Sequence, residues 1–148
     1  TDSTDSIMAP WSIMGIGALL GMLAVDAVFD FGDPNAAKSY YCTLLPTLWS
    51  FPFVLRVAIP VVFSGLCVVA NLIHSGSGSI FHLGTCVVLL IGGLPCFALS
   101  IDAVWKMCYS DLLPELAMST LRGAHGVMAV IFVVSILLES VGASRSTA

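Results

Sequence analysis

Four long apolar stretches constrain the fold of this chain more than any other feature of its sequence. They span residues 10–31, 51–74, 80–105 and 114–141. A helix needs about 20 mostly apolar residues to cross a hydrocarbon core about 30 Å thick. Because a backbone in lipid must satisfy its own hydrogen bonds, each stretch is predicted to be a membrane-spanning α-helix.

The scarcity of charged side chains supports the same prediction. The 148 residues include only nine acidic and five basic ones, and the mean hydropathy is +1.02. So few charges could not cover a water-soluble domain, in which about a quarter of the residues are charged. The predicted fold is therefore all-α, an integral membrane four-helix bundle, with residues 1–148 forming a single transmembrane domain.

Basic residues predict how the bundle is oriented in the membrane. Four spans place both termini on one side, called side A here, and the links after the first and third spans on the opposite side, side B. Lys38, Arg56, Lys106 and Arg122 lie on or near side B, against Arg145 on side A. The positive-inside rule then predicts that side B faces the cytoplasm, or the matrix if the membrane is an organellar inner membrane.

A possible internal repeat bears on how the helices are arranged. Residues 38–48 align without gaps onto residues 106–116, sharing Lys, Tyr, Leu, Leu, Pro and Leu, and residues 25–29 resemble residues 101–105. A true duplication would predict two tandem helical hairpins related by a pseudo-two-fold axis along the membrane normal. The alternative is chance similarity between two interface segments with a restricted composition.

Ionisable residues inside the spans form the first candidate site. At 1.5 Å per residue, Asp26, Arg56 and Asp102 lie about 5 to 8 Å inside the side B boundary, and Arg122 lies about 12 Å inside it. His125 lies one turn deeper, near the bilayer centre. Since helical side chains lean toward the N-terminus, the acids and bases are predicted to point at one another.

Pairing within this intramembrane polar cluster is expected, because an unpaired charge in lipid costs at least a few kcal/mol. The predicted ion pairs are Asp26 with Arg56 and Asp102 with Arg122, or the crossed pairs. One interpretation is an electrostatic lock that fixes the helix register. The other is a proton, ion or polar-substrate pathway, in which His125 titrates near neutral pH.

Two prolines within the spans predict local weakening of the helices. Pro60 and Pro95 each leave unpaired the carbonyl four residues earlier, that of Arg56 and that of Ile91. Transporters use broken helices of this kind to expose backbone to a substrate. Proline kinks are also ordinary in membrane helices, so a purely structural role is the simpler interpretation.

A second polar group is predicted on side A, where His74 and His82 flank a Gly/Ser turn and Glu139 returns to the same surface. These groups could in principle ligate a metal or haem. His82 and His125 are about half a bilayer apart, however, which is too far for paired axial haem ligands. We expect interfacial histidines, no metal and no cofactor, with bound lipid; haem or quinone is a minor alternative.

The cysteine pattern argues against thiol redox chemistry, because the five cysteines include no C-x-x-C pair. Cys42 and Cys108 both lie on side B, and if that side is reducing they should be free thiols.

Nothing in the sequence predicts an enzyme, because it contains no nucleotide-binding loop, nucleophile elbow or catalytic-triad spacing. No run of Lys or Arg suggests a nucleic-acid partner. We therefore expect a non-enzymatic protein, a small structural or accessory subunit of a larger membrane complex, whose partners are membrane lipids and other transmembrane subunits packed side-on. The alternative is a small proton, ion or solute transporter or channel that uses the intramembrane polar cluster.

Overall fold

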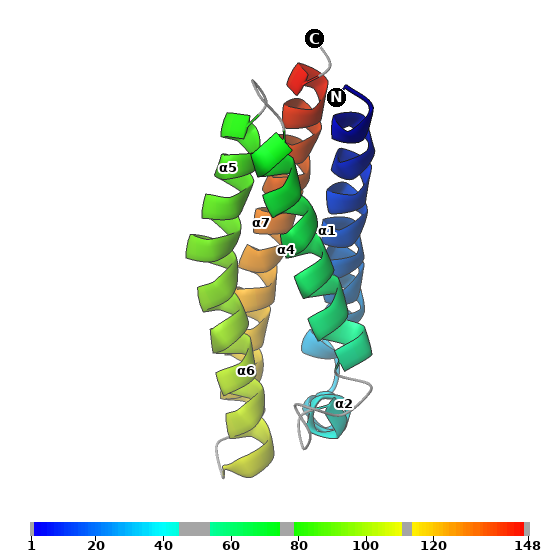
Figure 1. The fold of residues 1–148 in the computed structure, drawn as a ribbon. Helices are drawn as coiled ribbons and strands as arrows, with labels where there is room; N and C mark the ends of the chain where they lie inside the picture. The colour runs from blue at the N-terminus through cyan, green and yellow to red at the C-terminus, as the bar shows by residue number, and fades with distance from the viewer. Residues whose placement is uncertain (1, 45–53, 75–78, 111–113, 147–148) are drawn as a thin grey trace.

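A bundle of upright helices makes up the protein (Figure 1). The computed structural model describes residues 2–44, 54–74, 79–110 and 114–146. In chain order the elements are α1 (Asp2–Asp30), α2 (Pro34–Leu44), the π-helical turn Val54–Ala58, α4 (Ile59–His74), α5 (Ser79–Val88), the π-helical turn Leu89–Gly93, α6 (Leu94–Tyr109) and α7 (Pro114–Ser146). The start of α1 and the end of α7 lie at the same end of the bundle, and α2 lies crosswise at the other end (Figure 1).

Four segments are long and apolar enough to cross a membrane: Pro10–Asp30, Leu55–His74, Ser79–Tyr109 and Glu115–Arg145. They correspond to the four predicted stretches, and the all-α membrane bundle is confirmed. The third span is one continuous helical rod made of α5, a π turn and α6. The predicted start of the second stretch, at residues 51–53, lies outside the described residues.

The core is formed where the spans pack around a common axis. α1 packs against α4 and α7, the α5–α6 rod packs against α7, and α4 packs against α5. In the middle of the bundle a buried apolar cluster joins three of the spans; its members are Ile16, Leu19, Val68, Ile131 and Phe132. Many large apolar side chains face outward, among them Ile91 at 74% exposed and Leu66 at 65%. Such a surface suits lipid or other helices as its surroundings, because exposed apolar area is unfavourable in water.

Both proline positions are accompanied by widened helical turns. The π turn Val54–Ala58 includes Arg56, and the π turn Leu89–Gly93 includes Ile91, the residues four positions before Pro60 and Pro95. Both helices therefore depart from regular α geometry at the predicted positions, and their weakening stays a prediction. The π turn before Pro95 also lets α7 come close, because a Cβ on Gly92 would lie 2.7 Å from the Cδ1 atom of Ile131.

The helix α2 was not expected in the segment between the first two spans. Asp33 begins it, since its Oδ2 atom accepts a hydrogen bond from the backbone N–H of Ala36 at 3.1 Å, and Pro34 occupies the first helical position. The inner face of α2 buries Ala37 and Tyr41 against α6 and α7. Residues 38–44 thus lie in a separate crosswise helix, whereas residues 106–109 end a spanning rod, so the structure does not support the internal repeat.

A disulfide bond joins Cys42 of α2 to Cys108 of α6, with 5.5 Å between their Cα atoms. The expectation of free thiols on a reducing side B is therefore wrong for these two residues. That expectation rested on a reducing compartment at side B and not on the distance between the two residues, which α2 brings together. The other cysteines, Cys67, Cys86 and Cys96, are free thiols.

Candidate functional site

Two clusters of interacting polar side chains, each built around a buried carboxylate, lie at opposite ends of the bundle. The side A cluster takes one residue from each span: Ser12, Asn71, His82 and Glu139. The side B cluster gathers residues from α1, α2, the first π turn and α7: Asp26, Asp30, Tyr40, Tyr41, Arg56, Arg122 and His125. Along α1 and α7, the apolar core residues Ile16, Leu19, Ile131 and Phe132 separate the two clusters.

Glu139 is the centre of the side A cluster and is completely buried. Its Oε2 atom accepts hydrogen bonds from the Ser12 hydroxyl at 2.6 Å and from the Asn71 amide at 2.8 Å. Its Oε1 atom lies 2.9 Å from Nδ1 of His82. A buried carboxylate is costly unless it is paired and hydrogen-bonded. The three contacts offset that cost, and they tie α1, α4 and α5 to one side chain of α7.

The His82 ring is held tightly in this cluster. A Cβ on Gly142 would lie 2.7 Å from Cε1 of the ring and 2.8 Å from Nε2, so the ring occupies the space that this glycine leaves. Nε2 of His82 is buried and has no hydrogen-bond partner among the described residues. The same holds for Oγ of Ser135, one turn before Glu139 on α7. Nδ1 is therefore the ring nitrogen through which His82 contacts Glu139, while Nε2 faces the space beside Gly142.

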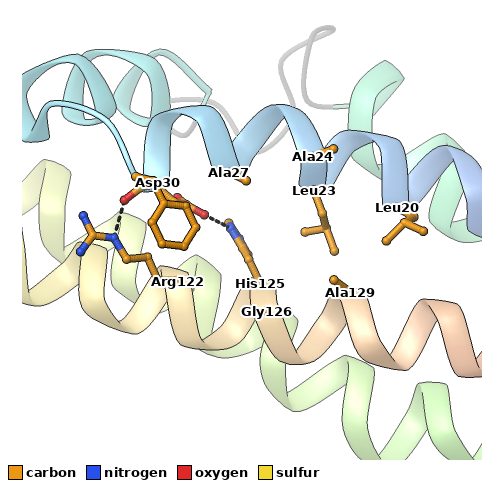
Figure 2. A pocket seen from close by; sticks show the side chains of 10 residues that line it. Leu20, Leu23, Ala24, Ala27, Asp30, Arg122, His125, Gly126 and Ala129 are labelled. Carbon is orange, nitrogen blue, oxygen red and sulfur yellow. Dashed lines mark hydrogen bonds and ion pairs between the residues drawn. The ribbon is translucent and has the colours of Figure 1, made fainter.

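Asp30, at the end of α1, is the centre of the side B cluster and is 1% exposed. Its carboxylate accepts a hydrogen bond from the Tyr41 hydroxyl at 2.6 Å and lies 2.7 Å from Nδ1 of His125. The Asp30 backbone carbonyl accepts a hydrogen bond from Nε of Arg122; Figure 2 shows this contact and the one to His125. Burial and the hydrogen bond to Asp30 raise the pKa of Tyr41, so its hydroxyl remains a donor.

An ion pair extends the cluster toward α4. Nη2 of Arg56 lies 3.2 Å from Oδ1 of Asp26, and both side chains are partly buried. The same Asp26 oxygen accepts a hydrogen bond from the Tyr40 hydroxyl at 2.7 Å. The Tyr40 ring stacks on Phe29 with 3.8 Å between centroids, and the Arg56 guanidinium lies 4.9 Å from the Tyr40 ring centroid. The two tyrosines of α2 thus donate hydrogen bonds to Asp26 and Asp30 of α1.

The predicted ion pair of Asp26 with Arg56 is present, whereas the prediction of an ion pair between Asp102 and Arg122 is wrong. Asp102 instead contacts Lys106, one turn along its own helix, at 2.5 Å, and its side chain is 54% exposed. Its neighbours Ala103 and Val104 are buried, so the rotation of α6 turns Asp102 outward. The predicted pair rested on the depth of both residues near side B, but depth does not determine which way a helix face points.

Of the three residues predicted on side A, the structure brings two together. His82 and Glu139 are in contact, whereas His74 is exposed and its Nδ1 atom lies 2.8 Å from the Ala70 carbonyl of its own helix. The sequence interpretation missed Asp30, Tyr41, Ser12 and Asn71. Asp30 had a usable signal, because it follows Asp26 by four residues and therefore lies on the same helix face.

A pocket of about 250 Å³ opens beside the side B cluster, between α1 and α7 (Figure 2). Asp30, Arg122 and His125 line one end of it, and Leu20, Leu23 and Ala129 line the other. Within the described residues no group of three or more His, Cys, Asp or Glu side chains is arranged to hold a metal ion. Comparison of the chain with protein families, curated proteins and solved structures finds no match.

Proposed function

We propose that this integral membrane protein has no enzymatic activity and is a small structural subunit of a larger membrane complex. The observation that supports this proposal most is the inward pairing of its buried charges. Glu139 contacts three other spans, and Asp30 contacts both α2 and α7. These contacts fit a lock that holds the helices in one register, as the first sequence interpretation expected.

The outer surface supports a role through side-on contact. Large apolar side chains are exposed on every span, for example Met14, Leu66, Ile91 and Val130. Lipid alone could cover these faces, but a partner helix packs on the same chemistry, and small residues such as Gly17 and Gly21 permit its close approach. Polar surface that could bind a soluble partner is scarce among the described residues.

The test is site-specific photo-crosslinking in native membranes, followed by purification in mild detergent. A photoreactive residue at Ile91, which is 74% exposed, should crosslink to one transmembrane protein in a fixed ratio. The matched control is the same residue at Val68, which is 1% exposed and should crosslink within the chain. A stable particle that contains this chain alone, with only lipid crosslinked at Ile91, would contradict the accessory-subunit proposal.

Transport of protons is the second candidate, and one observation favours it. α7 takes part in two histidine–carboxylate contacts, through His125 and through Glu139, and the Ser135 hydroxyl, which has no partner among the described residues, lies between them along the helix. The apolar core in the middle of the bundle argues against a continuous proton path.

The variants Asp30→Asn and Glu139→Gln, reconstituted in proteoliposomes, decide between the two proposals. Transport predicts normal protein level and lost proton flux, and the structural role predicts impaired folding or assembly with no specific change in flux.

The orientation in the membrane has two opposing indications. The basic residues near side B favour a cytoplasmic or matrix location for that side. The disulfide between Cys42 and Cys108 favours an oxidising compartment, because cytosolic thiols are kept reduced. Of the four cations, Arg56 is ion-paired with Asp26, whereas the Nε atom of Arg122 donates to the backbone carbonyl of Asp30. We therefore propose that side B faces the oxidising compartment.

A further inference from the structure

We propose that the pocket between α1 and α7 binds one anionic phospholipid, with the phosphate on Arg122 and an acyl chain along the apolar part of the pocket. The argument rests on the order of the lining residues. From the side B end inward, the pocket passes from Asp30 and Arg122 to Leu20 and Ala129 (Figure 2). The polar end therefore lies toward the membrane boundary and the apolar end toward its middle, which is the polarity of a lipid in the side B leaflet.

The pocket is small and lies open at the surface of the bundle. Its volume of about 250 Å³ is smaller than the pockets of about 300 Å³ and more that enclose drug-sized ligands. Small residues of both helices, Ala24, Ala27 and Gly126, form its middle part. Ala24 and Gly126 are also exposed at the outer surface of the bundle, so the pocket opens sideways to the surrounding lipid.

Charge selects an anionic headgroup. The Arg122 guanidinium is the permanent cation of the pocket lining. Its Nε atom is held by the Asp30 carbonyl, and its terminal nitrogens lie on the far side of Nε from His125, toward the boundary (Figure 2). The neighbouring Asp30 carboxylate is turned toward Tyr41 and His125, whose hydroxyl and Nδ1 atom it contacts at 2.6 and 2.7 Å. Arginine matches phosphate geometry, and basic pockets between membrane helices bind anionic headgroups.

The test is native mass spectrometry of the detergent-solubilised full chain, titrated with phosphatidylglycerol and with phosphatidylcholine of the same acyl chains. We expect about tenfold tighter binding of the anionic lipid, the effect of one charge-assisted phosphate contact. Arg122→Gln should abolish that preference, whereas Lys38→Gln, which removes an exposed side B cation outside the pocket, should leave it intact. Equal loss in both variants, or a preference that survives Arg122→Gln, would overturn the proposal.

Two glycines of α7 provide a steric test that does not depend on the arginine. A side chain at Gly126 meets nothing within 4 Å at its Cβ, so Gly126→Leu should fold and fill the pocket. Gly123, one turn earlier, has the same open space but does not line the pocket, and Gly123→Leu is the matched control. We expect the bound lipid to be lost in Gly126→Leu alone. Unchanged lipid binding in Gly126→Leu, or competition by glycerol phosphate without acyl chains, would also refute the lipid site.

Discussion

At the scale of single residues, the bundle depends on carboxylates that would be energetically unfavourable inside a membrane without their hydrogen-bond partners. Glu139 and Asp30 are each at most 1% exposed, and each collects contacts from other elements. A buried ion or hydrogen-bond acceptor costs several kcal/mol when its partners are removed, although the complete pair contributes little net stability. The consequence is specificity: a slip in helix register would leave such a group unpaired in an apolar environment.

Replacing Glu139 should reveal this dependence directly. Glu139→Ala removes the acceptor of the Ser12 hydroxyl, one of the two acceptors of the Asn71 amide and the partner of the His82 ring, and we expect a loss of about 3 kcal/mol in the free energy of unfolding. Glu139→Gln keeps one acceptor oxygen and should lose less. Reversible unfolding in mixed micelles with increasing denaturing detergent measures the difference. The adjacent exposed residue supplies the control, since Ser140→Ala should change stability by less than about 0.5 kcal/mol. Equal effects at both positions would refute the role given to Glu139.

The buried Tyr41 hydroxyl predicts a dependence of stability on alkaline pH. Its pKa is raised in the folded protein, so its stabilising contribution is complete below the unfolded value of about 10 and is lost as the pH rises above it. Between about pH 10 and the raised pKa of Tyr41 in the folded protein, titration of this hydroxyl should lower the free energy of unfolding by about 1.4 kcal/mol per pH unit. Tyr41→Phe should be less stable at neutral pH and should show a shallower alkaline slope. Unfolding series at several pH values compare the two proteins, and identical slopes would contradict the prediction.

At the scale of helices, the sequence predicts what depends on hydrophobic length and misses what depends on rotation. All four spans and the positions of both irregular turns follow from apolar length and proline chemistry. The contact of Asp26 with Arg56 follows from their depth, but the orientation of Asp102 depends on which face α6 packs inward, and one sequence does not determine it. The helix α2 was missed because its length of 11 residues is too short to stand out by hydropathy, although Asp33 and Pro34 form a recognisable helix start.

The attachment of α2 predicts an effect of reduction. α2 contributes Tyr40 and Tyr41 to the side B cluster, and the bond between Cys42 and Cys108 holds it to α6 across a sequence separation of 66 residues. Closing a loop of that length contributes up to about 4 kcal/mol in the chain-entropy model. The double variant Cys42→Ser, Cys108→Ser should have a lower unfolding midpoint. Its amide hydrogen exchange should become faster in α2 before any change is seen in the spans. Reductant should reproduce the effect in the parent protein and add nothing in the double variant. If exchange in α2 is unchanged, the bond does not hold this helix in place.

At the scale of the whole molecule, two layers of buried polar contacts enclose an apolar middle. The side A cluster joins all four spans, and the side B cluster joins α1, α7 and the crosswise α2. Each cluster restricts rotation of the helices at its own end of the bundle. Fixing both ends leaves the outer apolar faces in a set arrangement, which a subunit needs if it is to present the same surface to a partner helix. Side B also differs from side A in one covalent feature, because the disulfide bond that joins α2 to α6 lies on side B.

That difference leads to a prediction about topology. If side B faces an oxidising compartment, the Cys42–Cys108 bond should be present in membranes whose thiols were blocked before lysis. A mass-tag assay should then find three thiols that are free before reduction, those of Cys67, Cys86 and Cys96, and two more after it.

Labelling of an introduced cysteine tests the orientation independently of the bond. Ser39 is exposed on α2, so Ser39→Cys should react with a membrane-impermeant maleimide from the exoplasmic or lumenal side of a sealed membrane. Placing the new cysteine in a Cys42→Ser, Cys108→Ser background prevents disulfide exchange. Labelling from the cytoplasmic or matrix side, together with five free thiols in the parent protein, would show that the basic residues set the orientation. The covalent tie of α2 would then not form in the native membrane, and the hydrogen bonds of Tyr40 and Tyr41 would have to hold that helix alone.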